Sequence, residues 1–259
     1  MLTSPPHPHI GRRRVLSGAL AAVGLTTFAP LAAGCTASSS AATPKLPTGT
    51  PSSGPSAQFT PAQAWAHLAA GNTNWVAGKL QHPDQSIERR NEVAAEQHPF
   101  ATVFSCIDSR VSPEIVFDQG IGDLFVVRTG AHTLDDVVTG SIEYGPYSDD
   151  TPLIVVMGHQ RCGAVKAALA AIDAGTTLPG DLADVVDALR PAVADAKRQS
   201  GGDLVDKTVR AHIARTVKKL KRDPVLADRI RTRKLGLVGA HYELDTGKIS
   251  VLSTAGFKP

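Results

Sequence analysis

The chain has 259 residues, of which 42% are hydrophobic and 20% are charged, so it can bury a full globular core. Three of the 27 basic residues and none of the 24 acidic residues lie in residues 1–34, so the rest of the chain carries equal numbers of each. This balance does not support a polybasic surface for nucleic acid or anionic lipid.

The first 34 residues resemble an export signal that is removed from the mature protein. Three arginines at positions 12–14 precede an apolar run without acidic residues at positions 15–33. Paired arginines of this kind resemble the twin-arginine signal, and Leu31–Cys35 resembles the lipobox of bacterial lipoproteins. We therefore expect an exported protein, held at the outer face of the cytoplasmic membrane by a lipid on Cys35, or periplasmic or secreted if it is not lipidated. The alternative is a transmembrane anchor.

Residues 35–58 are almost entirely Ser, Thr, Ala, Pro and Gly, a composition that predicts a disordered tether. The folded domain is then expected at residues 59–259. Thr60, followed three residues later by Gln63, is typical of a helix start, because both side chains bond to free backbone N–H groups there. We expect this helix to end near Gly71.

Short, continuously apolar segments predict buried strands, and helical patterns lie between and after them. The expected strands are Ala101–Ile107, Asp123–Arg128 and Pro152–Met157. The expected helices start at Ser112 and Thr133, occupy residues 163–174, and continue as amphipathic stretches at 181–199 and 204–220. Apolar strands separated by helices imply an α/β fold with a mainly parallel four-stranded sheet flanked by helices. A hairpin of residues 235–239 and 248–252 adds a C-terminal antiparallel strand.

Two strand ends carry residues that bind soft metal ions. Cys106 stands at the carboxyl end of the first expected strand and His159 just beyond the third, and parallel strands bring such ends to one edge of a sheet. Cys162 follows at a helix start, which favours the thiolate. In an exported protein two cysteines commonly form a disulfide. Two thiolates and one imidazole instead make a tetrahedral zinc site with one free position, as hydrolytic chemistry requires.

Asp108 and Arg110 follow Cys106 at two-residue intervals, a spacing that can hold a carboxylate and a guanidinium side by side next to the metal. Elsewhere on a protein such a pair is commonly a surface ion pair of little consequence. At a strand end beside a cysteine, we interpret it as part of the site.

These residues belong to two longer motifs. Cys106–Arg110 (Cys-Ile-Asp-Ser-Arg) and Gly158–Gly163 (Gly-His-Gln-Arg-Cys-Gly) resemble the paired signatures of β-class carbonic anhydrases. The similarity extends from about residue 60 to residue 252 and includes Gly140–Gly145. Both motifs on successive strand ends, with the intervening segments in register, make the resemblance specific.

The resemblance implies reversible hydration of carbon dioxide to bicarbonate and a proton, with one zinc ion per chain. The zinc ligands would be Cys106, His159 and Cys162, with Asp108 as the fourth ligand in a closed state. In an open state Arg110 would hold Asp108 away from zinc, and these two are the expected catalytic residues. The residues implied in substrate binding are Gln97, Phe125, Tyr144 and Gly163. The resemblance also implies a homodimer or a higher homo-oligomer.

Other interpretations remain open. His132, where the family pattern differs, is a candidate proton shuttle, but an exposed loop histidine without a role is the plainer interpretation. Cys106 and Cys162 could form a redox dithiol, although no C-x-x-C is present and the polar residues beside them would then lack roles. The same fold and zinc could also serve a non-catalytic binding protein or a hydrolase of a CO2-like molecule such as carbon disulfide.

Overall fold

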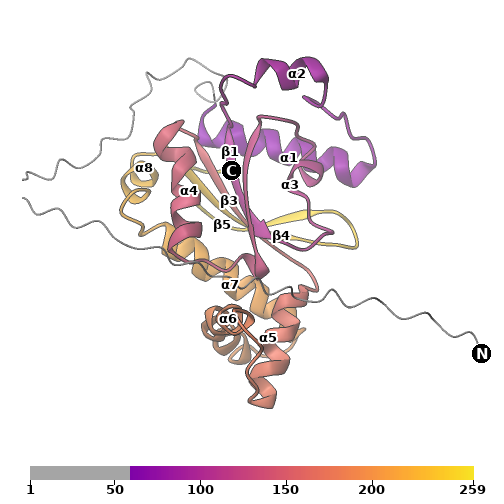
Figure 1. The fold of residues 1–259 in the computed structure, drawn as a ribbon, viewed down its shortest axis with the longest axis vertical. Coiled ribbons are helices and arrows are strands. Elements are labelled where there is room, and N and C mark those ends of the chain that lie inside the picture. Colours follow the sequence, from indigo (N-terminus) through magenta and orange to yellow (C-terminus); the bar gives the residue numbers. More distant parts are fainter. Residues whose placement is uncertain (1–58) are drawn as a thin grey trace, which may run out of the picture. The chain divides into compact units, whose positions relative to one another are not determined.

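The computed structural model describes residues 59–259, and the expected signal at residues 1–34 and tether at residues 35–58 lie outside them. One sheet has the strand order β2-β1-β3-β4-β5 (Figure 1). Its parallel strands are β1 (Ala101–Cys106), β2 (Leu124–Thr129), β3 (Leu153–His159) and β4 (Gly236–Tyr242), and β5 (Ile249–Ala255) runs antiparallel to β4. The α/β fold, its four parallel strands and its C-terminal antiparallel strand are therefore confirmed.

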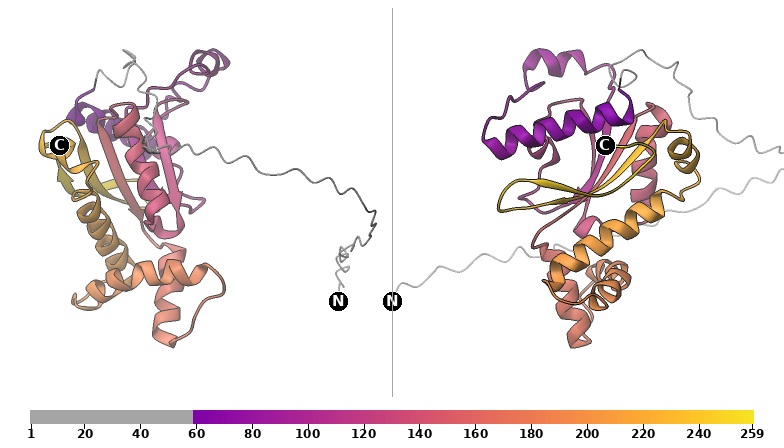
Figure 2. Two further views of the ribbon diagram at one scale, coloured as in Figure 1. Left: turned by 60° about the vertical axis from the view of Figure 1, so that its left-hand side comes forward. Right: turned by 180° about the vertical axis from the view of Figure 1, so that it is seen from behind.

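Helices cover both faces of the sheet (Figure 2). One apolar core lies beneath α1 (Pro61–Ala77) and α3 (Pro113–Val116), and the other beneath α4 (Asp136–Ser148), α5 (Gly163–Ala174), α6 (Leu182–Lys197) and α7 (Leu204–Leu220). The remaining described elements are α2 (Ile87–Glu92), the 3-10 turn η2 (Gly130–His132) and α8 (Ala227–Arg231). β1 and β3 are buried along their whole length, which explains why their sequences are mainly apolar. Across residues 59–259, no helix has the length and apolar character needed to span a membrane.

The first helix starts where predicted but is longer than predicted. Thr60 and Gln63 form a capping box, in which the Gln63 N–H donates to Thr60 Oγ1 and the Thr60 N–H donates to Gln63 Oε1. The predicted end near Gly71 is wrong, because the helix continues to Gly78, whose φ of 66° stops it. Gly71 serves packing instead, since a Cβ there would lie 1.7 Å from the Phe117 carbonyl oxygen.

The largest other differences from the predicted bounds are at a helix start and in the terminal hairpin. The helix expected at Thr133 begins at Asp136, because the Asp135 side chain caps it by accepting a hydrogen bond from the Val138 N–H at 2.7 Å. The terminal hairpin has longer strands than predicted and ends at Ala255. Neither change alters the topology.

Asn72 ties α1 to the rest of the domain through three hydrogen bonds. Its buried amide donates to carbonyl oxygens of α3 and of the β4–β5 loop at 3.1 and 2.8 Å, and accepts from a β5 N–H at 3.0 Å. We expect Asn72→Ala to lower the free energy of unfolding by about 2–4 kcal/mol in urea titrations, because buried backbone groups lose their partners. Asn74→Ala, on the same helix, removes a single side-chain bond and should cost roughly half as much or less. Equal losses would contradict this role for Asn72.

Candidate functional site

Two neighbouring strands end on residues whose side chains meet. β1 and β3 are parallel and adjacent, so Cys106 and His159 lie at the same edge of the sheet. Beyond β3 the chain turns through Arg161, whose φ is 53°, and Cys162 then stands at the N-cap of α5. This turn returns the second sulfur toward the first. His159 and Cys162, which follow Cys106 by 53 and 56 positions in the sequence, are thereby brought next to it. This is the arrangement that we expected from a parallel sheet.

The three side chains are arranged as ligands of one metal ion. Both sulfur atoms and a ring nitrogen of His159 lie within 4.8 Å of one another. The sulfur atoms are 3.9 Å apart, close to the separation of about 3.8 Å that a tetrahedral site with Zn–S distances of about 2.3 Å requires. His159 Nε2 is buried without a hydrogen-bond partner, whereas Nδ1 lies 3.0 Å from the Gln160 carbonyl oxygen. That contact makes Nδ1 the donor and leaves Nε2 free for a metal, so these residues fit zinc.

The two thiols hold their protons unequally. Contact with Cys162 lowers the pKa of Cys106 to about 4, because the Cys106 thiolate accepts a hydrogen bond from the neighbouring thiol. The same contact raises the pKa of Cys162, because losing its proton would place two negative sulfur atoms side by side. Neither cysteine is in a disulfide. The two cysteines together hold one proton, and a metal cation that binds both sulfur atoms would replace it.

Asp108 is held by Arg110 through paired hydrogen bonds. Arg110 donates from Nε to Oδ1 at 2.9 Å and from Nη2 to Oδ2 at 2.7 Å. These bonds lower the pKa of Asp108 to about 2, so the carboxylate is ionised at neutral pH. Its Oδ2 lies 3.8 Å from His159 Nε2, yet Asp108 is not part of the three-residue cluster. The carboxylate thus lies beside the three candidate metal ligands and is not one of them.

The backbone around Cys106 is fixed from the side of β2. Arg128 donates from Nε to the Cys106 carbonyl oxygen at 2.9 Å and from Nη2 to the Asp108 carbonyl oxygen at 2.7 Å. The Ala131 N–H donates to Cys106 Sγ at 3.3 Å. Gly163 opens α5 beside the cluster, and a Cβ there would meet no atom within 4 Å. Sequence reasoning missed Arg128 and Ala131, because contacts with backbone groups leave no residue pattern.

Known proteins of one family resemble this chain. A family model described as carbonic anhydrase matches residues 101–249. The chain is also 48% identical over 189 residues to carbonic anhydrase 2 of Mycobacterium tuberculosis, which covers 73% of this chain and 91% of that protein. This chain belongs to the carbonic anhydrase family. Family membership and the unpaired His159 Nε2 beside the two sulfur atoms both argue against the redox-dithiol interpretation.

Solved carbonic anhydrases of the β class share the fold. The β-carbonic anhydrase CcaA matches with a TM-score of 0.58 and 25% identity, over 73% of this chain and 95% of that one. Tetrameric β-carbonic anhydrases from Sordaria macrospora match with a TM-score of 0.59 and 22% identity, over 74% of this chain and 98% of that one. The parallel sheet with one antiparallel edge strand is thus the β-carbonic anhydrase architecture.

Within a single chain of this carbonic anhydrase, three predicted substrate-binding residues lie away from the candidate metal ligands. Gln97 is exposed and precedes β1, whereas Cys106 ends it, and a strand of six residues spans about 20 Å. Phe125 lies at the amino end of β2, and Tyr144 packs edge-on against it with ring centres 5.7 Å apart. One chain brings the other predicted site residues to the ligands but not these three, whose role in the pocket stays a prediction.

His132 is not the exposed loop histidine that we expected. It is 1% exposed, and its ring packs against His212 of α7 with ring centres 4.6 Å apart. Burial lowers the pKa of His132 well below its ordinary value and that of His212 to about 4, so both rings are neutral. The η2 turn folds this segment inward, which the loop-like sequence does not indicate. A proton shuttle needs contact with solvent, and the His132 ring lacks it.

A buried neutral histidine makes stability depend on pH. The pKa of His212 is about 4 in the folded chain against an ordinary 6.5, so stability is lost as pH falls through this window. We expect this residue to lower the free energy of unfolding by roughly 2 kcal/mol between pH 7 and pH 5. Glutamine does not titrate. In urea unfolding at pH 7 and pH 5, the free energy of unfolding of His212→Gln should therefore fall by roughly 2 kcal/mol less than that of the wild-type protein. The same loss in both proteins would contradict the prediction.

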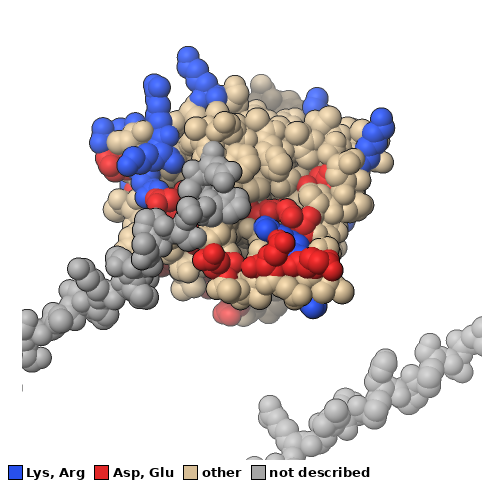
Figure 3. Space-filling model, turned by 90° about the horizontal axis from the view of Figure 1, so that it is seen from above, with Lys and Arg blue, Asp and Glu red and all other residues tan. Residues whose placement is uncertain are grey.

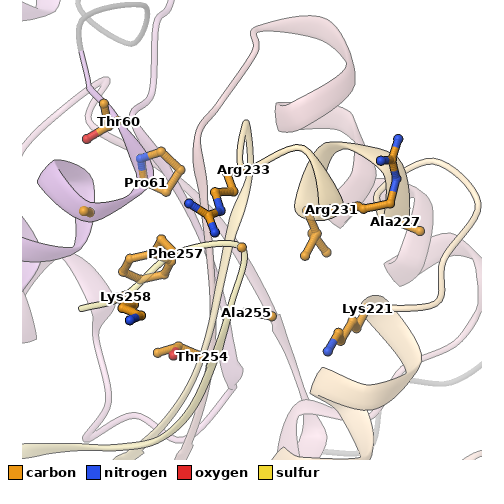
Figure 4. A pocket seen from close by; sticks show the side chains of 13 residues that line it. Thr60, Pro61, Lys221, Ala227, Arg231, Arg233, Thr254, Ala255, Phe257 and Lys258 are labelled. Carbon is orange, nitrogen blue, oxygen red and sulfur yellow. The ribbon is translucent and has the colours of Figure 1, made fainter.

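A large hollow lies away from this site. It has a volume of about 960 Å³ and is lined by residues such as Lys221, Arg233 and Phe257 (Figure 4). Ala255, which also lines it, pairs with Leu237 near the start of β4, so the hollow is at the end of the sheet opposite the candidate metal ligands. In the view from above, several acidic side chains gather around one basic side chain, and other basic side chains lie nearer the periphery (Figure 3). Ligand chemistry, and not cavity volume, therefore identifies the site of this carbonic anhydrase.

Proposed function

We propose that this chain catalyses the reversible hydration of CO2 to bicarbonate and a proton, with one zinc ion bound by Cys106, His159 and Cys162. Family membership supports the reaction. The observation that carries the ligand set is the buried cluster of two sulfur atoms and an unpaired imidazole nitrogen within 4.8 Å. Three protein ligands leave one position of a tetrahedral site open, as in catalytic zinc sites. A bound zinc ion would supply a Lewis acid that makes water a nucleophile near neutral pH.

The polar residues of the site orient the reacting water. Asp108 is ionised and lies 3.8 Å from His159 Nε2, so it can accept a hydrogen bond from water beside the ligands. Arg110 binds both carboxylate oxygens, which keeps this acceptor in one direction. The guanidinium charge also favours the bicarbonate anion at the mouth of the site. Arg128 holds the backbone that carries the acid and the first cysteine.

Zinc analysis and stopped-flow CO2 hydration of the purified chain test this proposal. We expect close to one zinc atom per chain and a rate that rises toward alkaline pH, because two thiolates donate more charge to zinc than imidazoles do. A zinc protein that does not hydrate CO2 would support a binding protein or a hydrolase of a related molecule instead. A zinc-free protein with two reactive thiols would support the redox interpretation.

We also propose that two chains associate through β2. Among the described strands, β2 is at an edge of the sheet and pairs with β1 alone. Apolar side chains of α4 are exposed nearby, with Val137 at 79% and Tyr147 at 64%. An open strand edge beside exposed apolar surface is typical of a contact between subunits. The tetrameric state of the Sordaria proteins, which share the fold, agrees with such association.

Antiparallel pairing of two β2 strands would complete the pocket. Such pairing about a two-fold axis places the amino end of one β2 beside the carboxyl end of the other. The carboxyl end is Thr129, which pairs with Cys106. Phe125 and Tyr144 of the partner subunit would then approach the metal ligands. Light scattering should give at least twice the mass of one chain, and a fully active monomer would contradict this proposal.

We further propose that the chain is exported and anchored through Cys35, or released outside the cytoplasm if it is not lipidated. The arginines at positions 12–14 and the lipobox-like Leu31–Cys35 support this, although both lie outside the described residues. Zinc loading before export would protect the thiols of the site from oxidation. Cell fractionation and mass spectrometry of the mature N-terminus test it, and a cytoplasmic full-length chain would contradict it.

A further inference from the structure

A strained turn lies directly behind one of the cysteines. In η2, Ala131 and His132 have φ angles of 52° and 49°, a left-handed conformation that residues other than glycine rarely adopt. This conformation directs the Ala131 N–H at Cys106 Sγ, 3.3 Å away and buried. Strained backbone persists only where its surroundings hold it, and it is commonly found at functional sites. The contacts that hold η2 therefore bear on the sulfur atom.

His212 of α7 is the main side chain that holds this turn. Its Nε2 lies 3.3 Å from the His132 carbonyl oxygen, and because a carbonyl accepts, the imidazole N–H is the donor. The two rings pack with centres 4.6 Å apart, and both residues are buried. Phe104 of β1 also lies edge-on to the His132 ring, with ring centres 6.1 Å apart. The turn is thus held by contacts with both the carbonyl oxygen and the ring of His132.

A second tie fixes the ends of the turn. Thr129 Oγ1 donates to the Thr133 carbonyl oxygen at 2.7 Å, and the Thr133 N–H donates to the Gly130 carbonyl oxygen at 3.1 Å. The Ile107 N–H, just after β1, donates to the Thr129 carbonyl oxygen at 3.0 Å. The position of the turn relative to the end of β1 is therefore set by hydrogen bonds on both sides.

We propose that His212 is a positioning residue, which holds η2 so that the Ala131 N–H donates to Cys106 Sγ. This inference rests on the proposed role of Cys106 as a zinc ligand. A hydrogen bond to a thiolate withdraws electron density from the sulfur, so the sulfur donates less charge to a bound metal. A less neutralised metal is a stronger Lewis acid. His212 therefore raises the catalytic power of the site without touching the metal, the water or the substrate.

A histidine that merely fills the core is the alternative, and two substitutions separate the roles. His212→Met keeps a similar volume but has no N–H donor. His212→Gln keeps an amide that can donate to the same carbonyl oxygen. Thr208→Val, one turn earlier on α7 and also buried, serves as the control because the Thr208 side chain bonds within its own helix. A structural role predicts similar behaviour for the methionine and glutamine variants.

Cobalt(II) in place of zinc reports on the sulfur, because the energy of the sulfur-to-cobalt charge-transfer absorption depends on the electron density of the thiolate. In the cobalt-loaded full chain, we expect His212→Met to move this absorption to longer wavelength. In the zinc enzyme the same variant should lower kcat about 10-fold with KM unchanged. His212→Gln should keep the wild-type absorption and most of kcat, and Thr208→Val should leave both unchanged.

Thr129→Val provides a second variant if His212→Met does not fold. It removes the other side-chain tie of the turn and should shift the absorption in the same direction. Unchanged absorption in the folded methionine variant, or in Thr129→Val where the former does not fold, overturns the positioning role. Equal shifts in the methionine and glutamine variants overturn it as well. If the wild-type protein shows no charge-transfer absorption, the proposed ligand set fails instead, so the two failures are distinguishable.

Discussion

Cys162→Ala is expected to remove zinc from the protein and to lower the rate of CO2 hydration by more than about 100-fold. Loss of a residue that only hydrogen-bonds to a metal ligand typically costs about 10- to 100-fold, and loss of the ligand itself should cost more. The substitution removes one of two sulfur atoms that lie 3.9 Å apart. A single thiolate and an imidazole then remain, and zinc sites of enzymes need three protein ligands. Zinc content by atomic spectroscopy and stopped-flow hydration on the same sample measure both effects.

Ser105→Ala is the matched control for this prediction. Ser105 precedes Cys106 on β1, is fully buried, and its hydroxyl has no hydrogen-bond partner. The control therefore changes a small buried side chain next to the site without removing a ligand or a bond, and it should keep its zinc. A Cys162→Ala protein that retains zinc and activity would show that the metal has a different ligand set.

The meeting of the candidate metal ligands could be predicted because it follows from the sheet. β1 and β3 are buried along their whole length, so their sequences are mainly apolar, which is typical of parallel strands. Parallel neighbours end at one edge, which is enough to bring Cys106 and His159 together. The two-residue spacing of Asp108 and Arg110 likewise depends on local backbone alone, and their side chains are paired.

Other features depend on packing that the sequence does not express. Glycine commonly ends helices, so the sequence predicts a helix end near Gly71, but this glycine instead permits a close approach to the Phe117 carbonyl oxygen. The sequence Gly-Ala-His predicts an exposed loop, because nothing in it indicates two successive left-handed residues. It is this left-handed turn at Ala131 and His132 that accompanies the burial of the His132 ring. Phe125 and Tyr144 carry a family pattern, yet one chain places them at the amino end of the sheet. Their proposed role in the pocket requires a second chain, and a sequence pattern does not show which residues a second chain would bring close.

Asp108→Asn is expected to keep zinc near one atom per chain and to lower kcat for CO2 hydration by about 10²- to 10³-fold. The carboxylate is outside the ligand cluster, so the metal does not depend on it. Its oxygens are both held by Arg110, and an amide presents a donor where the second oxygen accepted. The amide therefore loses the fixed direction of the acceptor as well as its charge.

Asp245→Asn separates this effect from a general loss of negative charge. Asp245 is also paired with an arginine, Arg161, at 2.6 Å, but its side chain is 60% exposed and the pair lies at the surface. Exposed pairs contribute little, so this variant should change kcat by less than about twofold. If Asp108→Asn lost zinc as well, the carboxylate would be needed for metal binding in solution. If it kept full activity, the water would be oriented by another group, and the pairing of Asp108 with Arg110 would serve the loop after β1 alone.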